Sequence, residues 1–181
     1  MTLSPQAVKQ AHDRISSYIK RTPLMTSTRL NQWLGHNIIF KVEGLQNVGA
    51  FKVRGAFNAL LSLKEQNNIP DHAVTFSSGN HAQSLALAGK TLGVKTTIFL
   101  PSYTSTIKQQ ATKSYGANVI NTDSREQAEI QSKALQQQGA SFIHPYDNDD
   151  VICGQGTATY EALLDGANPD AIFAPCGGGG L

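Results

Sequence analysis

The sequence predicts an α/β protein in which parallel sheets are covered by helices on both faces. The first observation is a regular alternation of short apolar runs with longer stretches of helical periodicity, beginning near residue 38. This alternation is typical of parallel strands joined by crossover helices. The second is size, because 181 residues, 40% of them hydrophobic, suffice to bury a sizeable core. The third is that three polar or glycine-rich motifs each follow a predicted strand.

The first 42 residues predict two helices and one strand. Ser4 and Pro5 open the first helix, because serine is a good N-cap and proline suits the first helical position. Apolar residues at helical spacing extend it to about Lys20. A short helix over Thr28–Leu34 ends at a glycine, and the β-branched run 38–42 predicts a strand.

The rest of the chain alternates between the two kinds of element. Helical periodicity is found at residues 53–67, 80–92, 106–115, 124–138 and 156–164. Strands are predicted at residues 73–76, 96–100, 118–121, 141–143 and 171–174. The strands are short and apolar, which favours a sheet buried on both faces.

Three motifs occupy the points where predicted strands end. Lys52 follows the strand at 38–42, the Ser-Ser-Gly-Asn-His turn at 77–81 follows the second strand, and the four-glycine run at 177–180 follows the last. Open parallel sheets bind their ligands beyond the carboxyl ends of the strands. The sequence therefore predicts that the three motifs form one shared site.

The glycine run is interpreted as a phosphate cradle. Glycines let backbone N–H groups approach an anion closely and adopt the positive φ values that such a nest needs. The alternative is an ordinary flexible loop or tight turn. A Walker motif is excluded because no Gly-Lys-Ser/Thr follows, and a dinucleotide GxGxxG motif is a poor match.

The turn at 77–81 places hydroxyl, amide and imidazole groups at the start of a predicted helix. Ser77, Ser78, Gly79, Asn80 and His81 would present a substrate carboxylate with free N–H groups and the positive end of the helix dipole. The alternative is an ordinary N-cap, since serine, glycine and asparagine are all good cap residues. His81 by itself is better interpreted as a packing or supporting residue than as a catalytic base.

Lys52 is the candidate covalent residue. A lysine amine condenses with an aldehyde when burial or a neighbouring charge lowers its pKa enough to populate the neutral form. The apolar neighbours Phe51 and Val53 favour partial burial, and Arg54 would add a like charge if it pointed inward. The alternative is a surface lysine on the first turn of a helix.

Composition excludes several other functions. A net charge of +2, without any lysine or arginine run, argues against nucleic acid or an anionic membrane as partner. No apolar stretch approaches the roughly 18 residues of a membrane span, and the N-terminus lacks a signal-peptide core. Cys153 and Cys176 lie far apart, so neither a disulfide framework nor a metal site is predicted. We expect two reduced thiols in a cytoplasmic protein.

With these motifs in hand, the chain resembles the serine/threonine dehydratase and serine racemase family. These are pyridoxal-phosphate enzymes of fold type II, the tryptophan synthase β type. The resemblance rests on matches in family order at residues 41–43, 46, 49–56, 77–83, 93–95, 101, 108, 115–117, 145–147, 154–157 and 177–181. It covers the chain from residue 22 onward.

The resemblance implies a role for each motif residue. Lys52 would bind pyridoxal phosphate covalently and later remove the substrate Cα proton, with Phe51 packed against the cofactor. Asn80 would bond the hydroxyl of the pyridine ring. The turn at 77–81 would bind the substrate carboxylate, and Ser78 would lie on the face opposite Lys52. The phosphate would be held by Gly177, Gly178, Gly179 and Gly180.

The implied activity is that of an ammonia-lyase. It would convert the small hydroxy amino acids L-threonine or L-serine to 2-oxobutanoate or pyruvate plus ammonia. A serine racemase-like enzyme is the alternative, with Ser78 returning the proton, and Ala50 favours it slightly because many dehydratases carry serine there. A truncated, non-catalytic fragment of such an enzyme is a further alternative.

The resemblance also implies a two-domain architecture with an incomplete large domain. Residues 1–72 and 146–181 would belong to the large cofactor-binding domain and residues 73–145 to a small domain. The partner of the pyridine nitrogen, and any metal site, would follow Leu181. A homo-oligomer, dimer or tetramer, is expected of the intact protein.

Overall fold

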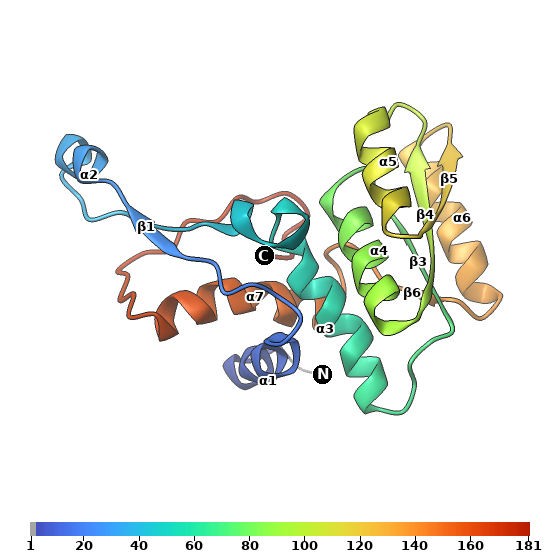
Figure 1. Cartoon of the computed structure of the whole chain (residues 1–181), viewed down its shortest axis with the longest axis horizontal. Coiled ribbons are helices and arrows are strands. Elements are labelled where there is room, and N and C mark those ends of the chain that lie inside the picture. The colour runs from blue at the N-terminus through green and yellow to red at the C-terminus, as the bar shows by residue number, and fades with distance from the viewer. Residues whose placement is uncertain (1–2) are drawn as a thin grey trace.

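The computed structural model describes residues 3–181 (Figure 1). The helices are α1 (Pro5–Ile15), α2 (Thr28–Leu34), α3 (Lys52–Glu65), α4 (Asn80–Leu92), α5 (Thr106–Ser114), α6 (Arg125–Gln137) and α7 (Asp149–Leu164). The strands are β1 (Leu24–Thr26), β2 (Ile39–Lys41), β3 (His72–Phe76), β4 (Lys95–Pro101), β5 (Asn118–Thr122) and β6 (Ser141–Phe142). Two 3₁₀ turns, η1 (Glu43–Leu45) and η2 (Asn47–Gly49), precede α3.

Four strands form one parallel sheet in the order β5-β4-β3-β6. Helices α4 and α5 pack on one face and α6 on the other, so both faces are covered (Figure 1). The predicted α/β class is confirmed. Only one parallel sheet occurs within residues 3–181; the second sheet is the antiparallel pair β1-β2.

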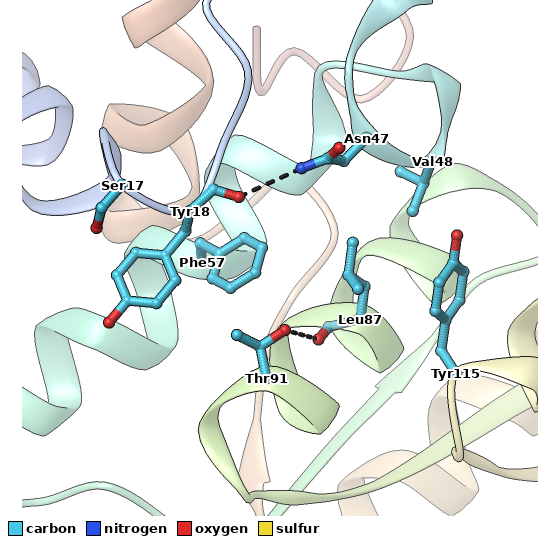
Figure 2. Close-up of a pocket in the computed structure, with 8 residues that line it drawn as sticks. All are labelled: Ser17, Tyr18, Asn47, Val48, Phe57, Leu87, Thr91 and Tyr115. Atoms are coloured by element: carbon cyan, nitrogen blue, oxygen red, sulfur yellow. Dashed lines mark hydrogen bonds between the residues drawn. The ribbon is translucent and has the colours of Figure 1, made fainter.

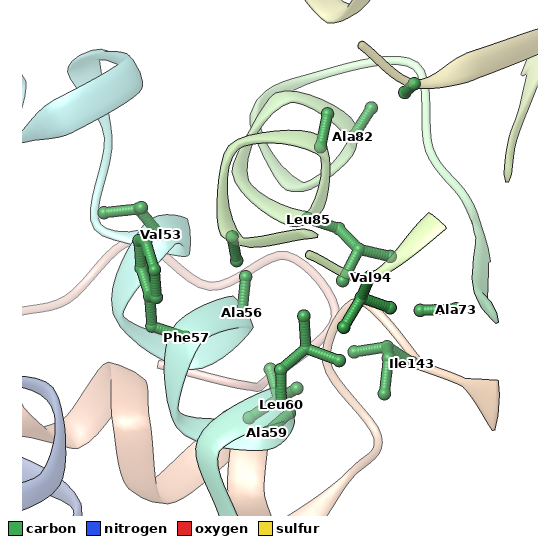
Figure 3. Packing of buried hydrophobic residues seen from close by; sticks show 14 of the residues in the cluster. Val53, Ala56, Phe57, Ala59, Leu60, Ala73, Ala82, Leu85, Val94 and Ile143 are labelled. Atoms are coloured by element: carbon green, nitrogen blue, oxygen red, sulfur yellow. The ribbon is translucent and has the colours of Figure 1, made fainter. Parts of the chain in front are cut away.

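The core lies mainly where α3 packs between α4 and α7. Phe57 and Leu60 of α3, Leu85 of α4 and Ile143, which follows β6, belong to one buried apolar cluster, in which Leu60 lies close to Ile143 (Figure 3). A smaller apolar cluster fills the space between the sheet and α6. Helix α3 is buried along most of its length, which fixes the position of its first residue, Lys52.

Glycines permit the close crossing of α3 and α7. A Cβ on Gly154 would lie 2.6 Å from the Arg54 carbonyl oxygen and 2.7 Å from the Gly55 Cα. A Cβ on Gly55 would lie 2.7 Å from the Val151 carbonyl oxygen. These contacts are with backbone atoms, which cannot rotate away. The close crossing of the two helices therefore requires that residues 55 and 154 have no side chain.

We therefore expect Gly154→Ala to lower the free energy of unfolding by about 1–3 kcal/mol or more, the range for overpacking a core. Gly44→Ala is the matched control, because a Cβ at Gly44 meets nothing within 4 Å. Its effect should stay within about 0.5 kcal/mol. Urea denaturation measures both, and equal effects would contradict the close crossing.

Several predicted boundaries match, and others are wrong. The N-cap at Ser4 and the glycine stop at Gly35 (φ 68°) are confirmed. The first helix ends at Ile15, not near residue 20, because Ser16 and Ser17 are weak helix formers that lead into a turn. Helix α7 begins at Asp149, with Asn148 as its N-cap, and not at residue 156. Gly154 and Gly156 lie inside this helix, where they allow close packing against neighbouring segments.

The strand predicted at 171–174 is not formed. No described residue pairs with this segment, and the Phe173 side chain is 95% exposed. An apolar run becomes a strand only when a neighbouring strand satisfies its backbone groups. The common strand-end argument therefore holds only for the turn at 77–81, since β2 before Lys52 pairs with β1 outside the parallel sheet.

Within residues 3–181, no helix combines the length and the apolar character that crossing a membrane requires.

Candidate active site

Lys52 is the first residue of α3 and is half-buried. Its Nζ donates a hydrogen bond to the Pro145 carbonyl oxygen at 2.7 Å and lies 5.2 Å from the centre of the Phe51 ring. Burial lowers the pKa of Lys52 below its ordinary value. The neutral, nucleophilic amine is therefore easier to form here than at a surface lysine.

This pKa shift has a direct test. Competitive amine labelling against pH, followed by mass spectrometry, should give Lys52 a midpoint below the ordinary value of 10.5. Lys9 is the internal control, because its hydrogen bond to Asp13 raises its pKa above 10.5. The two midpoints should therefore fall on opposite sides of 10.5. A Lys52 midpoint at or above that of Lys9 would contradict the burial of its amine.

The turn before Lys52 is held in an unusual conformation. Val48 has φ 56° and Gly49 has φ 69°, and a β-branched residue rarely adopts positive φ. The preceding Gln46 is buried and forms two hydrogen bonds with the Lys20 backbone: Oε1 accepts from its N–H at 3.0 Å and Nε2 donates to its carbonyl at 2.6 Å. Surrounding contacts thus fix the turn that delivers Lys52.

Arg54 does not act on Lys52 as a neighbouring charge; burial accounts for the shift of Lys52. The guanidinium is fully buried and donates to both carboxylate oxygens of Glu43, at 2.7 and 2.8 Å, and to both of Glu161, each at 2.8 Å. Lys41 pairs with Glu161 at 2.9 Å. Burial alone would raise the pKa of Glu161, but the hydrogen bonds from Arg54 and Lys41 hold it below its ordinary value.

The glycine run packs against Tyr146. A Cβ on Gly178 would lie 2.4 to 2.6 Å from three atoms of the Tyr146 ring, and a Cβ on Gly180 would lie 2.8 Å from the Tyr146 backbone. Gly179 has φ 79°, a conformation that glycine adopts freely. Side chains are thus excluded from the run on the side that faces Tyr146, while Gly177 faces open space.

The turn at 77–81 joins β3 to α4. The Ser77 N–H continues the β3-β4 ladder by donating to the Phe99 carbonyl at 3.1 Å, and the Gly79 N–H donates to the Ser77 hydroxyl at 3.2 Å. The side chains of Ser78 and Asn80 are exposed at the start of α4. Their exposure leaves them accessible to a ligand.

His81 points into the protein and not toward solvent. Its Nε2 donates to the Ile143 carbonyl oxygen at 3.2 Å, and its Nδ1 is buried without a hydrogen-bond partner. Burial lowers the pKa of His81 to about 3, and the charge of Lys52 contributes to the shift. His81 is therefore neutral at physiological pH and lies close to Lys52.

A short segment, residues 143–146, brings the three motifs together. The Ile143 carbonyl accepts from His81, the Pro145 carbonyl accepts from Lys52, and the Tyr146 ring packs on the glycine run. The sequence predicts the shared site, but we assigned no role to this segment. The available signal was its position after the strand at 141–143, on the edge that carries the turn at 77–81.

Arg125 is another residue that sequence reasoning missed. Its Nη2 lies 3.3 Å from the Tyr146 hydroxyl, and its guanidinium lies 5.8 Å from the centre of the Phe76 ring. It therefore adds a positive charge near the 143–146 segment from α6.

A separate pocket lies elsewhere in the structure. It measures about 420 Å³ and lies between the end of α1, η2, α3 and α4 (Figure 2). Its wall includes Tyr18, Asn47, Val48, Phe57, Leu87 and Tyr115. None of the predicted site residues lines it, so it is separate from the Lys52 site.

The Lys52 site fits an aldehyde-bearing phosphate cofactor. It offers an amine of lowered pKa, a glycine run free of Cβ atoms, and a helix start suited to a carboxylate. On an α/β fold with a parallel sheet, this combination is typical of enzymes that bind such a cofactor.

Comparison with known proteins identifies the class. The model of the pyridoxal-phosphate dependent enzyme family matches residues 15–181, and the chain belongs to this family. The chain is 46% identical over 178 residues to the L-threo-3-hydroxyaspartate ammonia-lyase of Saccharomyces cerevisiae, covering 96% of this chain and 54% of that protein. It is 40% identical over 178 residues to the L-threonine ammonia-lyase of Geobacter sulfurreducens, covering 96% and 44%.

A solved structure agrees with this assignment. The crystal structure of serine racemase from Dictyostelium discoideum superposes with a TM-score of 0.91 at 42% identity, covering 99% of this chain and 59% of that one. The predicted family, and pyridoxal phosphate as cofactor, are confirmed. The chain spans about half the length of the curated relatives it matches. The roles of the individual site residues stay predictions.

Proposed function

We propose that this chain carries the lysine site of a pyridoxal-phosphate-dependent ammonia-lyase acting on L-threonine or L-serine. The observation that carries the proposal is the Lys52 amine, which has a lowered pKa and is held by the Pro145 carbonyl beside the glycine run that packs on Tyr146. Ammonia-lyases among the relatives support the reaction class.

The chain's own residues would divide the work. Bound pyridoxal phosphate supplies an aldehyde for amines and an electron sink that weakens the substrate Cα–H bond. Lys52 would hold the cofactor, and its free amine would then take the Cα proton. The Pro145 carbonyl accepts an N–H of that amine and so orients it. Phe51 would pack on the cofactor, and Asn80 would bond its ring hydroxyl.

Backbone groups would bind the anions. The N–H groups of the glycine run at 177–180 would hold the phosphate, because no Cβ blocks their approach. The substrate carboxylate would bind at the turn 77–81, where α4 begins and its free N–H groups favour a negative charge.

Racemisation of serine is the second candidate. It is favoured by the close match to serine racemases and by the exposed Ser78 hydroxyl at the turn, which would return the proton from the other face. In this proposal, lyase and racemase would use the same cofactor-binding residues of this chain and would differ in the fate of the substrate β-hydroxyl.

The test uses the 181-residue chain with added pyridoxal phosphate. We expect a visible absorbance band, a borohydride-stable adduct on Lys52, and keto acid from L-threonine or L-serine. If D-serine forms from L-serine faster than pyruvate does, the lyase proposal is wrong and the racemase proposal is supported. A colourless protein with no trapped adduct would contradict both the lyase and the racemase proposals, and would favour the alternative that the chain is a non-catalytic fragment.

The glycine run makes a separate prediction. Gly178→Ala should weaken pyridoxal phosphate binding by about tenfold or more, which corresponds to a loss of ~1.4 kcal/mol in binding free energy. The reason is that the new methyl group would overlap the Tyr146 ring and displace the glycine run. Gly177→Ala is the control, since its Cβ would face open space. Absorbance titration gives both dissociation constants, and equal losses would mean that contact with Tyr146 does not place the run.

The division into a large domain (residues 1–72 and 146–181) and a small domain (73–145) is proposed on the same grounds. Residues 1–2 of this division lie outside the described residues. A homo-oligomeric state and a cytoplasmic location also stay predictions.

A further inference from the structure

His144 belongs to the 143–146 segment and directly precedes Pro145 in the chain. Its Nδ1 accepts the backbone N–H of Asp147 at 2.8 Å and that of Tyr146 at 3.4 Å. An imidazole nitrogen that accepts is unprotonated, so the neutral ring carries its proton on Nε2. The His144 side chain thus closes the turn that follows it in the chain.

Three aromatic neighbours fix the plane of the His144 ring. Its centre lies 4.6 Å from that of Tyr146, 5.6 Å from that of Phe76 and 5.7 Å from that of Phe142. The interplanar angles of 79° to 84° are edge-to-face arrangements, a favoured geometry for aromatic pairs. The ring therefore cannot swing freely, and Nδ1 stays directed at the backbone of the turn.

The turn that His144 closes carries two parts of the active site. The Pro145 carbonyl holds the Lys52 amine, and Tyr146 supports Gly178 with its ring and Gly180 with its backbone. We propose that neutral His144 is a positioning residue of this site, which sets the Pro145 carbonyl and the Tyr146 ring through its Nδ1 and releases them when Nδ1 is protonated. The effect of His144 on cofactor capture rests on the proposed function, whereas its effect on the geometry of the turn does not.

The groups around His144 set the direction of its pH dependence. Burial lowers its pKa below 6.5; Asp147 and Glu129 of α6 oppose this, and Lys133 and Arg125 of α6 add to it. His81 of α4 lies within electrostatic range and is neutral. Since the folded-state pKa is depressed, the closed turn is stable above pH 6.5 and is lost as the pH falls through the lower, folded-state value.

Two variants separate the acceptor from the ring. His144→Phe keeps an aromatic ring but removes the acceptor. His144→Asn removes the ring but keeps an oxygen that accepts backbone N–H groups two or three residues on, as in an Asx-turn. The unaltered chain supplies a third arm, because pH alone removes its acceptor.

The first readout is hydrogen exchange of the Asp147 amide, followed by NMR together with the titration of the His144 ring. In the unaltered chain, exchange should accelerate on acidification with the midpoint of the ring. At pH 8 we expect about tenfold faster exchange of this amide in His144→Phe, because the variant loses roughly one hydrogen bond. In His144→Asn we expect little change in exchange. Identical exchange in the Phe variant and the unaltered chain, or no link to the ring titration, would overturn the proposal.

The second readout is Lys52 itself, by amine labelling and by borohydride trapping with pyridoxal phosphate. In His144→Phe the labelling midpoint of Lys52 should differ from that of the unaltered chain, because the Pro145 carbonyl that accepts from its amine is displaced, and trapping should fall about tenfold; His144→Asn should restore both. Trapping that is equal in all three chains would overturn the positioning role. If exchange and labelling follow His144 but no chain traps the cofactor, the proposed function fails and the positioning role stands.

Discussion

Lys52→Arg and Lys52→Ala should both abolish the borohydride-stable adduct with pyridoxal phosphate. Arginine keeps a positive charge and can still donate to the Pro145 carbonyl, but its guanidinium does not lose a proton in proteins and cannot condense with the aldehyde. Alanine removes both properties. Loss in the two variants alike would therefore assign the effect to covalent chemistry and not to the hydrogen bond at 2.7 Å.

Turnover should fall further than cofactor binding does. If Lys52 also takes the Cα proton, its loss removes a proton-transfer step that contributes about 10²–10⁴-fold to rate. Mass spectrometry after trapping measures the adduct, and keto acid formation measures turnover. Lys133→Ala is the control, because this exposed lysine pairs with Glu129 on the surface of α6. An adduct that persists in Lys52→Ala would place the reactive lysine elsewhere.

Local physics explains why part of this site could be predicted from sequence. The turn at 77–81 follows an apolar run whose neighbours on both sides, β4 and β6, lie within the chain, so the strand forms and the turn falls at its carboxyl end. The start of α3 near Lys52 was readable because apolar residues follow it at helical spacing. In both cases the determining contacts involve strongly patterned segments.

The parts that were not predicted depend on groups without a sequence signature. The carbonyls of Ile143 and Pro145 hold His81 and Lys52, yet every residue has a carbonyl. The burial of Arg54 depends on Glu43 and Glu161, which lie 11 and 107 residues away and are recognisable as partners only once α3 and α7 cross. The run at 171–174 has the composition of a strand, but composition does not supply a pairing partner.

The charge network around Arg54 gives the largest expected effect on stability. Glu161→Ala removes the carboxylate that accepts two of the Arg54 hydrogen bonds and pairs with Lys41. The buried Arg54 guanidinium would then keep its two hydrogen bonds to the Glu43 carboxylate but lose the two to Glu161, and with them half of the negative charge that balances it. Breaking a buried ion pair on one side costs about 3–5 kcal/mol, so we expect a loss of unfolding free energy in this range. Urea denaturation measures it.

Glu129→Ala is the matched control, because its pair with Lys133 is exposed and should contribute at most about 0.5 kcal/mol. The pH dependence of stability is a further test of the network. The folded-state pKa of Glu161 is depressed, so its stabilisation is present above 4.5 and lost as the pH falls through the lower folded-state value. This acid dependence should shrink more in Glu161→Ala than in Glu129→Ala, because Lys133 lowers the pKa of the exposed Glu129 carboxyl only through a solvent-screened surface pair.

Position connects this network to chemistry. Arg54 follows Lys52 by two residues on the first turn of α3, and Glu43 belongs to the 3₁₀ turn before it. The network thus joins the approach to Lys52, the helix that carries it and α7. Glu161→Ala should therefore slow trapping of pyridoxal phosphate even in conditions where the chain stays folded. Unchanged trapping in a destabilised but folded variant would show that the network stabilises the fold without placing the lysine.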